Sequence, residues 1–209
     1  MQLFSKLIPT LLLVFGLTAT SIIAQNIPSS ADKVTPLLIG ATIPDVSLKT
    51  TAGETVKLRE LASERPTVLV FYRGGWCPYC SRHMMDLQKI EKDLVALGYQ
   101  VLAVSPDRPE ELSKSIDKGD LKYQLLSDSP MDVTKAFGIA YKLDDKTVAR
   151  YKENGIDLEV SSGYKHHLLP APAVFILNQE GKIRFSYVNP DYKERIDGDV
   201  LLTAAKAYK

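Results

Sequence analysis

The chain contains very little cysteine. Its 209 residues include two, Cys77 and Cys80, and both belong to one C-x-x-C. A secreted scaffold held together by disulfides needs several cysteine pairs, and a cysteine-ligated iron–sulfur cluster needs about four thiolates. Both classes of protein are therefore excluded.

An excess of charge of one sign is also lacking. The sequence has 26 Lys and Arg against 25 Asp and Glu, which gives a formal net charge of +1. No general electrostatic attraction to nucleic acid follows from such a balance. With 45% hydrophobic and 24% charged residues, the composition is that of an ordinary globular chain and rules out disorder, collagen-like repeats and a coiled coil.

Long apolar runs are limited to one, residues 7–23. It follows a short start that carries Lys6, and it closes near the small residue Ala24. This layout predicts a signal peptide over residues 1–24 and a periplasmic or secreted protein that needs no membrane after cleavage. An uncleaved membrane anchor is the alternative, although the run is short for a bilayer and contains Pro9 and Gly16.

The rest of the chain reads as one α/β domain. Residues 25–36, rich in Pro, Ser, Asp and Asn, are predicted to be a flexible lead-in, and residues 37–209 have the length of one domain. Residues 142–168 are polar without a clear pattern, and loops of that length are often functional. Apolar periodicity and turn signals predict strands at 46–49 and 55–58 (a hairpin), 67–72, 101–105, 125–126, 173–177 and 183–188, and helices at 78–97, 109–118, 131–137 and 197–208.

This order of elements predicts a thioredoxin-like fold. It comprises a right-handed βαβ unit, a helix, a β-hairpin and a closing helix. We therefore expect a central mixed β-sheet flanked by helices, with an N-terminal β-hairpin extension.

The C-x-x-C allows more than one interpretation. A c-type haem site needs His directly after the second cysteine, where this chain has Ser81. A zinc site would require His166 and His167, with His83 in reserve, but adjacent histidines point in different directions. A redox dithiol requires the pair at a strand-to-helix turn, which is where the predicted strand and helix place it. We favour the dithiol and expect no metal and no cofactor.

The predicted helix assigns different environments to the two sulfurs. Pro78 suits the first helical position, which makes Cys77 the N-cap, where free N–H groups and the helix dipole lower a thiol pKa. Cys80 falls on the apolar stripe and is turned inward. We therefore expect Cys77 to face solvent and attack, and Cys80 to resolve.

Four nearby side chains are further candidates for the site. We expect Trp76 and Tyr79 to form a partly exposed rim that contacts a partner, and His83 to be a surface residue. Arg73 either raises the local positive potential or is simply exposed. Gly74 and Gly75 allow a sharp turn into the site.

Pro172 is the remaining signal, directly before the predicted buried strand 173–177. In a thioredoxin fold, a cis-proline at this position packs against the C-x-x-C, and its backbone can pair with an incoming chain. Pro170 competes for the role, and a trans proline that opens a strand is the simpler alternative.

Five motifs resemble those of the peroxiredoxin-like branch of the alkyl hydroperoxide reductase and thiol-specific antioxidant (AhpC/TSA) family. The most specific is Phe-Tyr-Arg-Gly-Gly-Trp-Cys-Pro-Tyr-Cys at residues 71–80. Weaker ones follow the family's order at residues 40–45, 104–107, 126–128 and 175–181. The resemblance, which runs from about Leu37 to Ala207, implies a thioredoxin-like fold and thiol-based reduction of peroxides or disulfides.

The resemblance also implies which residues of the family's site are kept. Cys80 matches the peroxide-attacking cysteine, whereas Cys77 stands where the family has threonine. Pro172 replaces the peroxide-binding arginine, and Arg73 replaces the proline of the peroxidatic loop. A thioredoxin-like buried acid is lacking too, because its position holds Phe71.

These observations favour a thiol–disulfide oxidoreductase acting through Cys77 and Cys80, with Trp76, Arg73 and Pro172 contacting the substrate. The alternative is an antioxidant thiol peroxidase that reduces hydroperoxides through Cys80 or Cys77. A non-catalytic zinc or partner-binding module comes third. Either enzyme would act on protein disulfides or hydroperoxides and exchange electrons with a thioredoxin-like protein.

Overall fold

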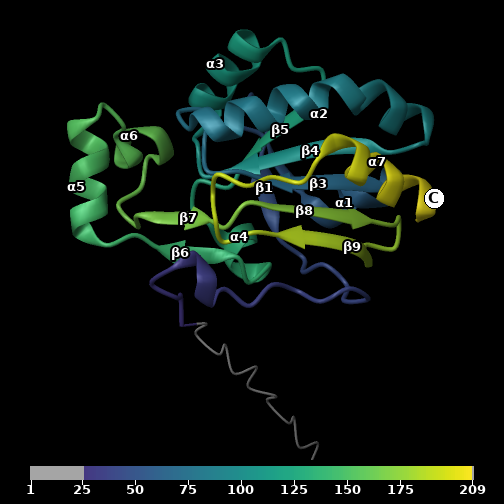
Figure 1. Ribbon diagram of the computed structural model, residues 1–209, viewed down its shortest axis with the longest axis horizontal. Coiled ribbons are helices and arrows are strands. Elements are labelled where there is room, and N and C mark those ends of the chain that lie inside the picture. Colours follow the sequence, from purple (N-terminus) through teal and green to yellow (C-terminus); the bar gives the residue numbers. More distant parts are fainter. Residues whose placement is uncertain (1–25, 209) are drawn as a thin grey trace, which may run out of the picture.

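A seven-stranded mixed β-sheet forms the centre of the structure, a computed structural model that describes residues 26–208, the side chains of Asp117 and Lys118 excepted (Figure 1). Its strand order is β2-β1-β5-β4-β3-β8-β9. The elements are η1 (Ala31–Lys33), β1 (Ser47–Lys49), β2 (Thr55–Lys57), α1 (Leu58–Glu64), β3 (Thr67–Phe71), α2 (Pro78–Ala96), β4 (Gln100–Ser105), α3 (Pro109–Gly119), β5 (Gln124–Ser127), α4 (Asp132–Ala136), β6 (Ala140–Lys142), α5 (Asp145–Glu153), α6 (Leu158–Ser162), β7 (Leu168–Pro170), β8 (Ala173–Leu177), β9 (Ile183–Val188) and α7 (Gly198–Ala207).

Both faces of the sheet are covered by helices, which confirms the α/β class and the thioredoxin-like fold. Val68 and Val70 of β3 pack in the core under α2, α3 and α7, whereas Leu69 and Phe71 pack in the core with α1 and α4. Successive side chains of a strand point to opposite faces, so a strand buried on both sides must be apolar throughout. The continuous apolar run at residues 67–71 follows from that requirement.

The predicted N-terminal hairpin is confirmed and lengthens the sheet. Strands β1 and β2 pair antiparallel with Leu48 opposite Val56, and Lys49 of β1 pairs with Ser127 of β5. Strand β5 pairs with β4 on one side and β1 on the other. Strand β9, predicted at residues 183–188, forms one edge of the sheet.

Two helical regions were not predicted. Helix α1 follows β2 directly and buries Leu58 and Ala62. Residues 142–168, which showed no clear pattern, form helices α5 and α6 between β6 and β7, two strands that pair antiparallel. Most side chains of α5 are exposed, and none is buried. It therefore shows little of the apolar periodicity on which our helix predictions rest.

The segment before the sheet is attached to the domain. Residues 25–36 were predicted to be a flexible lead-in, but residues 31–33 form η1, Pro28 O accepts a hydrogen bond from Lys142 N at 2.8 Å, and Thr35 N donates to Gly138 O at 3.0 Å. Ile27 and Val34 pack against buried clusters. Residues 1–24 lie outside the described residues, so the signal peptide stays a prediction. Within residues 26–208, no helix is long and apolar enough to cross a membrane.

Phe137 tests the core under α1 and α4. Its ring lies 5.0 Å from that of Phe71 and 5.2 Å from that of Phe175, and it is fully buried. Phe137→Ala should lower the free energy of unfolding by about 3–5 kcal/mol through lost burial and a cavity. Val160→Ala, at a side chain that is 55% exposed, should change it by less than about 0.5 kcal/mol. Urea unfolding measures both, and equal effects would contradict this account of the core.

Candidate active site

The turn between β3 and α2 carries the dithiol. Gly74 has a φ of 144°, which favours glycine, and its carbonyl accepts a hydrogen bond from Cys77 N at 3.2 Å. Asp107, which follows β4, accepts a hydrogen bond from Gly75 N at 2.7 Å. The turn is thus fixed at two points, and Pro78 then begins α2 with Cys77 as its N-cap, as predicted.

Both cysteines are free thiols and both are buried. Cys80 lies in the core under α2, as predicted, but Cys77 does not face solvent: each is 1% exposed. Trp76 and Tyr79, the predicted rim, are half-buried and pack against the same core cluster. The expectation that Cys77 is presented to solvent is therefore wrong, because the turn is folded against the domain.

Arg73 turns inward and is 2% exposed. Its Nη1 donates a long hydrogen bond to Cys77 Sγ at 3.9 Å, and its Nη2 donates to the Tyr151 hydroxyl. The guanidinium carbon lies 5.2 Å, 5.7 Å and 4.1 Å from the ring centres of Trp76, Tyr151 and Tyr192. The sequence left two alternatives open for Arg73, and the structure places its positive charge beside the first sulfur.

A second arginine contacts the other sulfur. Arg195 Nη2 lies 3.4 Å from Cys80 Sγ, and Arg195 Nη1 donates to the carbonyls of Tyr192 and Glu194, the latter at 2.7 Å. Sequence reasoning missed Arg195, which stands 115 positions from Cys80 in a polar loop without a motif. Its role depends on how the segment before α7 packs on α2.

The two thiols differ in acidity. The pKa of Cys77 is lowered to about 6, first because the Cys80 side chain hydrogen-bonds its sulfur, then because the Cys80 backbone N–H does, and further because Arg73 and Arg195 are positive. The pKa of Cys80 is raised well above its usual value by the same hydrogen bond and by burial. The contribution that we expected from the helix N-terminus is present, because the backbone N–H of Cys80 in the first turn of α2 lowers this pKa, although the neighbouring thiol contributes more.

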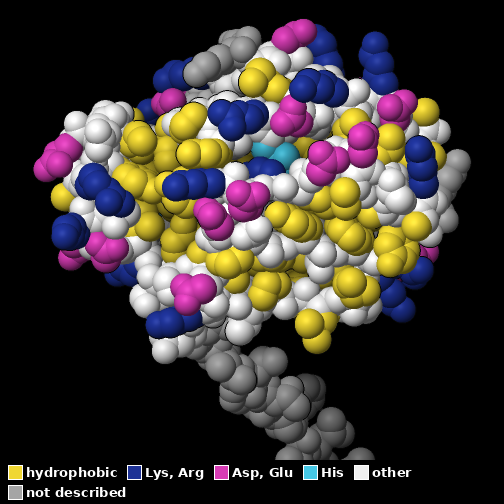
Figure 2. All heavy atoms as spheres, in the orientation of Figure 1, with side chains coloured by type: hydrophobic (Ala, Val, Ile, Leu, Met, Phe, Trp, Pro, Cys, Tyr) yellow, Lys and Arg dark blue, Asp and Glu magenta, His cyan; other side chains and the backbone are white. Residues whose placement is uncertain are grey.

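His83 is not the surface residue that we expected. It is 5% exposed, burial lowers its pKa to about 4, and its Nε2 has no hydrogen-bond partner among the described atoms. It borders a hollow of about 460 Å³ between α2 and the segment that leads into α7, which Arg195 also borders. Figure 2 shows histidine and basic side chains meeting in a hollow on this face.

The three histidines do not meet at the cysteines. His166 Nε2 lies 2.8 Å from Ser129 O, and His167 Nε2 lies 3.0 Å from Glu159 Oε1. In the part of the chain that the structure describes, no three His, Cys, Asp or Glu side chains form a group that could hold a metal ion.

Pro172 is buried, and the backbone around it is already hydrogen-bonded. The described residues contain no cis peptide bond, so Pro172 is trans. Ala171 N donates to Ile139 O at 2.8 Å, and Pro172 O accepts from Asn189 N at 3.1 Å. The free backbone edge that we expected for an incoming chain is therefore absent at these two groups.

Comparisons with known proteins agree on one family. The model of the AhpC/TSA family matches residues 39–186. Peroxiredoxin Bcp of Escherichia coli (strain K12) is 29% identical over 173 residues, 83% of this chain and 98% of that protein. Peroxiredoxin Bcp of Bacillus subtilis (strain 168) is 33% identical over 101 residues, 48% of this chain and 64% of that protein.

Solved structures share the fold. Peroxiredoxin Q of Xanthomonas campestris superposes with a TM-score of 0.62 at 21% identity, covering 84% of this chain and 98% of that one. Reduced Prx3 of Vibrio vulnificus superposes with a TM-score of 0.66 at 18% identity, covering 81% and 99%.

The protein is a thioredoxin-fold oxidoreductase with a buried dithiol at the start of a helix. The family match spans more than half of the chain. The chain belongs to the AhpC/TSA family, and its relatives are peroxiredoxins. Thiol–disulfide exchange, which we placed first from the sequence, is less well supported than the peroxidase alternative.

The hydrogen bond between the thiols can be tested by a matched pair of variants. Cys80→Ala removes the donor to Cys77 Sγ and should raise the Cys77 pKa from about 6 toward the ordinary range of about 8.5. Cys80→Ser keeps a hydroxyl donor and should raise that pKa less. Thiolate absorbance against pH measures both pKa values. If both variants gave the wild-type curve, the Cys80 side chain would not contribute to the acidity of Cys77.

Proposed function

We propose that this protein is a thiol peroxidase in which Cys77 attacks the hydroperoxide and Cys80 resolves the product. The observation that carries the proposal is that each buried sulfur has its own guanidinium group. Arg73 Nη1 lies 3.9 Å from Cys77 Sγ, and Arg195 Nη2 lies 3.4 Å from Cys80 Sγ. The family's arginine position holds Pro172, so Arg73 and Arg195 supply from other segments the positive charge that peroxide chemistry needs.

The first step consumes one hydroperoxide. The Cys77 thiolate attacks the terminal oxygen of the hydroperoxide, an S–O bond forms as the O–O bond breaks, and the leaving alkoxide takes a proton to form an alcohol, or water from hydrogen peroxide. Cys77 becomes a sulfenic acid. Negative charge passes from sulfur to oxygen in this step, so a fixed guanidinium next to both atoms stabilises the transition state without reorganisation.

The second step closes a disulfide. Cys80 Sγ attacks the Cys77 sulfenic acid, and the hydroxyl leaves as water with the Cys80 proton. A thioredoxin-like dithiol protein then returns two electrons and two protons to the pair. Because both sulfurs are buried, this reduction requires the 74–80 segment to open to the donor.

Burial also favours a small oxidant over a protein disulfide. Attack on a polypeptide disulfide requires the sulfur to reach a second chain, whereas Cys77 is 1% exposed and the backbone at Pro172 is already paired. Related proteins agree with this choice, since the Vibrio vulnificus Prx3 structure holds H2O2 and a Xanthomonas campestris relative is described by its alkyl peroxide reduction activity.

The assignment of the two cysteines differs from what the family resemblance implies. The family register matches Cys80 with the attacking cysteine, but the lowered pKa belongs to Cys77. A thiolate is the nucleophile, so at neutral pH the reactive sulfur is that of Cys77.

Single cysteine variants test this assignment. Reduced Cys80→Ser should still react once with hydrogen peroxide and then accumulate sulfenic acid at Cys77, without a disulfide. Reduced Cys77→Ser should react at least about 100-fold more slowly, because the remaining thiol is protonated. Stopped-flow oxidation and mass spectrometry measure both. Rapid oxidation of Cys77→Ser would give the attacking role to Cys80, and no reaction of the wild type would refute the peroxidase.

Arg73 can be tested by removing its charge at similar volume. Arg73→Met should lower the rate constant for peroxide oxidation by about 10²–10³, as loss of one transition-state donor does. Arg73→Lys should be intermediate, because an ammonium keeps the charge without the planar fork. Arg184→Met, on the exposed face of β9, should react at the wild-type rate. Equal rates in all four proteins would remove Arg73 from the mechanism.

A further inference from the structure

Asp107 is a buried acid without a role in the steps described so far. It ends the 104–107 motif, two residues after β4, and is 2% exposed. A carboxyl group so deeply buried is costly unless it is hydrogen-bonded or protonated. Only one of its two oxygens has a partner among the described atoms.

Its contacts lead directly to the dithiol turn. Oδ2 accepts the hydrogen bond from Gly75 N at 2.7 Å, and a Cβ atom added to Gly74 would lie 2.8 Å from Oδ1. The Gly74 carbonyl in turn accepts from Cys77 N. The carboxyl group of Asp107 therefore supports the two glycines that hold Cys77 at its helix cap.

The surroundings of Asp107 place its pKa near neutral pH, so that its charge changes there. Burial raises its pKa to about 7, against the hydrogen bonds from the Gly75 backbone and the Ser105 side chain, while Glu111 and Cys77 raise it further. Tyr72 is also within its electrostatic reach. Asp107 lines one small cavity together with Lys114 of α3, and a second one together with His166 and His167, which precede β7.

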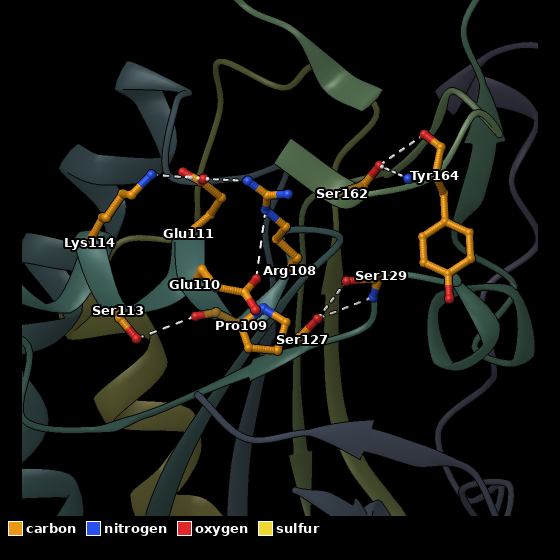
Figure 3. Close-up of polar contacts among 10 residues, drawn as sticks. All are labelled: Arg108, Pro109, Glu110, Glu111, Ser113, Lys114, Ser127, Ser129, Ser162 and Tyr164. Atoms are coloured by element: carbon orange, nitrogen blue, oxygen red, sulfur yellow. Dashed lines mark hydrogen bonds and ion pairs between the residues drawn. The ribbon is translucent and has the colours of Figure 1, made fainter. Parts of the chain in front are cut away.

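Glu111 has positive partners of its own. Lys114 Nζ lies 2.8 Å and Arg108 Nη2 3.4 Å from Glu111 Oε1, and both point at that carboxylate in Figure 3. Its negative charge is thus largely balanced. Cys77 and Asp107 are then two acids of one site that both change charge near neutrality.

We propose that Asp107 is a positioning residue for Cys77: its carboxyl group holds the Gly74–Gly75 turn, and its negative charge opposes that of the Cys77 thiolate. The inference deepens the proposed function and rests on it for its catalytic meaning. A protonated Asp107 favours the thiolate, and an ionised Asp107 disfavours it. The two protons then leave in coupled steps rather than independently.

Two substitutions separate the charge from the hydrogen bond. Asp107→Asn keeps an oxygen that can accept from Gly75 N but cannot ionise, whereas Asp107→Ala loses both. Asp93→Asn changes an exposed carboxyl group further along α2 and is the matched control. Circular dichroism establishes that each variant is folded.

Thiolate absorbance of the reduced proteins, followed against pH, tests the charge. Asp107 ionises above the Cys77 pKa, at about 7 against about 6, so its charge affects only the upper part of the Cys77 titration. Asp107→Asn should therefore lose that upper part, titrate Cys77 in one sharp step, and lower its midpoint by less than about one unit. The wild type and Asp93→Asn should show the same broader curve. A wild-type curve for Asp107→Asn would overturn the electrostatic part of the proposal.

Amide hydrogen exchange tests the anchor. Asp107→Ala should exchange at Gly75 and Cys77 at least about 10-fold faster than Asp107→Asn, and unchanged exchange would overturn the positioning role. Neither measurement uses peroxide, so both hold whether or not the protein proves to be a peroxidase. Conversely, a wild type that does not react with hydrogen peroxide refutes the proposed function and leaves these two results standing.

Discussion

The site depends on one physical constraint, the burial of a guanidinium group beside a thiol. Burial disfavours the charge of Arg73, and its pKa is nevertheless raised by Tyr141, Tyr151 and the Cys77 sulfur. Its contacts among the described side chains are this sulfur, a phenol hydroxyl and three aromatic rings, none of them a carboxylate. A buried cation favours a nearby anion, and the ionised form of Cys77 is the anion at hand.

The polar region 142–168, whose helices were not predicted, supplies part of the surroundings of Arg73. Tyr151 of α5 accepts the hydrogen bond from Arg73, and its ring centre lies 5.8 Å from that of Trp76. The Tyr192 ring lies under the Arg73 guanidinium group and meets Tyr79 edge to face, and the same loop brings Arg195 to Cys80. Segments distant in sequence thus enclose one turn, which is why Cys77 is buried at a helix end that would otherwise be open.

Much of the fold could be predicted because its signals are local. The apolar run of β3, the stripe of α2 and the turn residues between β1 and β2 each determine one element from a few neighbouring side chains. Helix α5 could not be predicted, since it buries none of its residues and so has little periodic pattern. The lead-in was misjudged because its polar composition conceals backbone hydrogen bonds to residues more than 100 positions away.

The sequence by itself determined the fold class, the place of the two cysteines at the start of a helix and the order of their sulfurs along it, because spacing and capping are properties of adjacent residues. Only the tertiary structure decided that Cys77 is buried, that Arg73 turns inward, and that Arg195 and Asp107 belong to the site. The distances between these groups are set by how β3, β4 and the segment before α7 pack together. No local pattern records such distances, since arginine and aspartate side chains are mostly found on solvated surfaces.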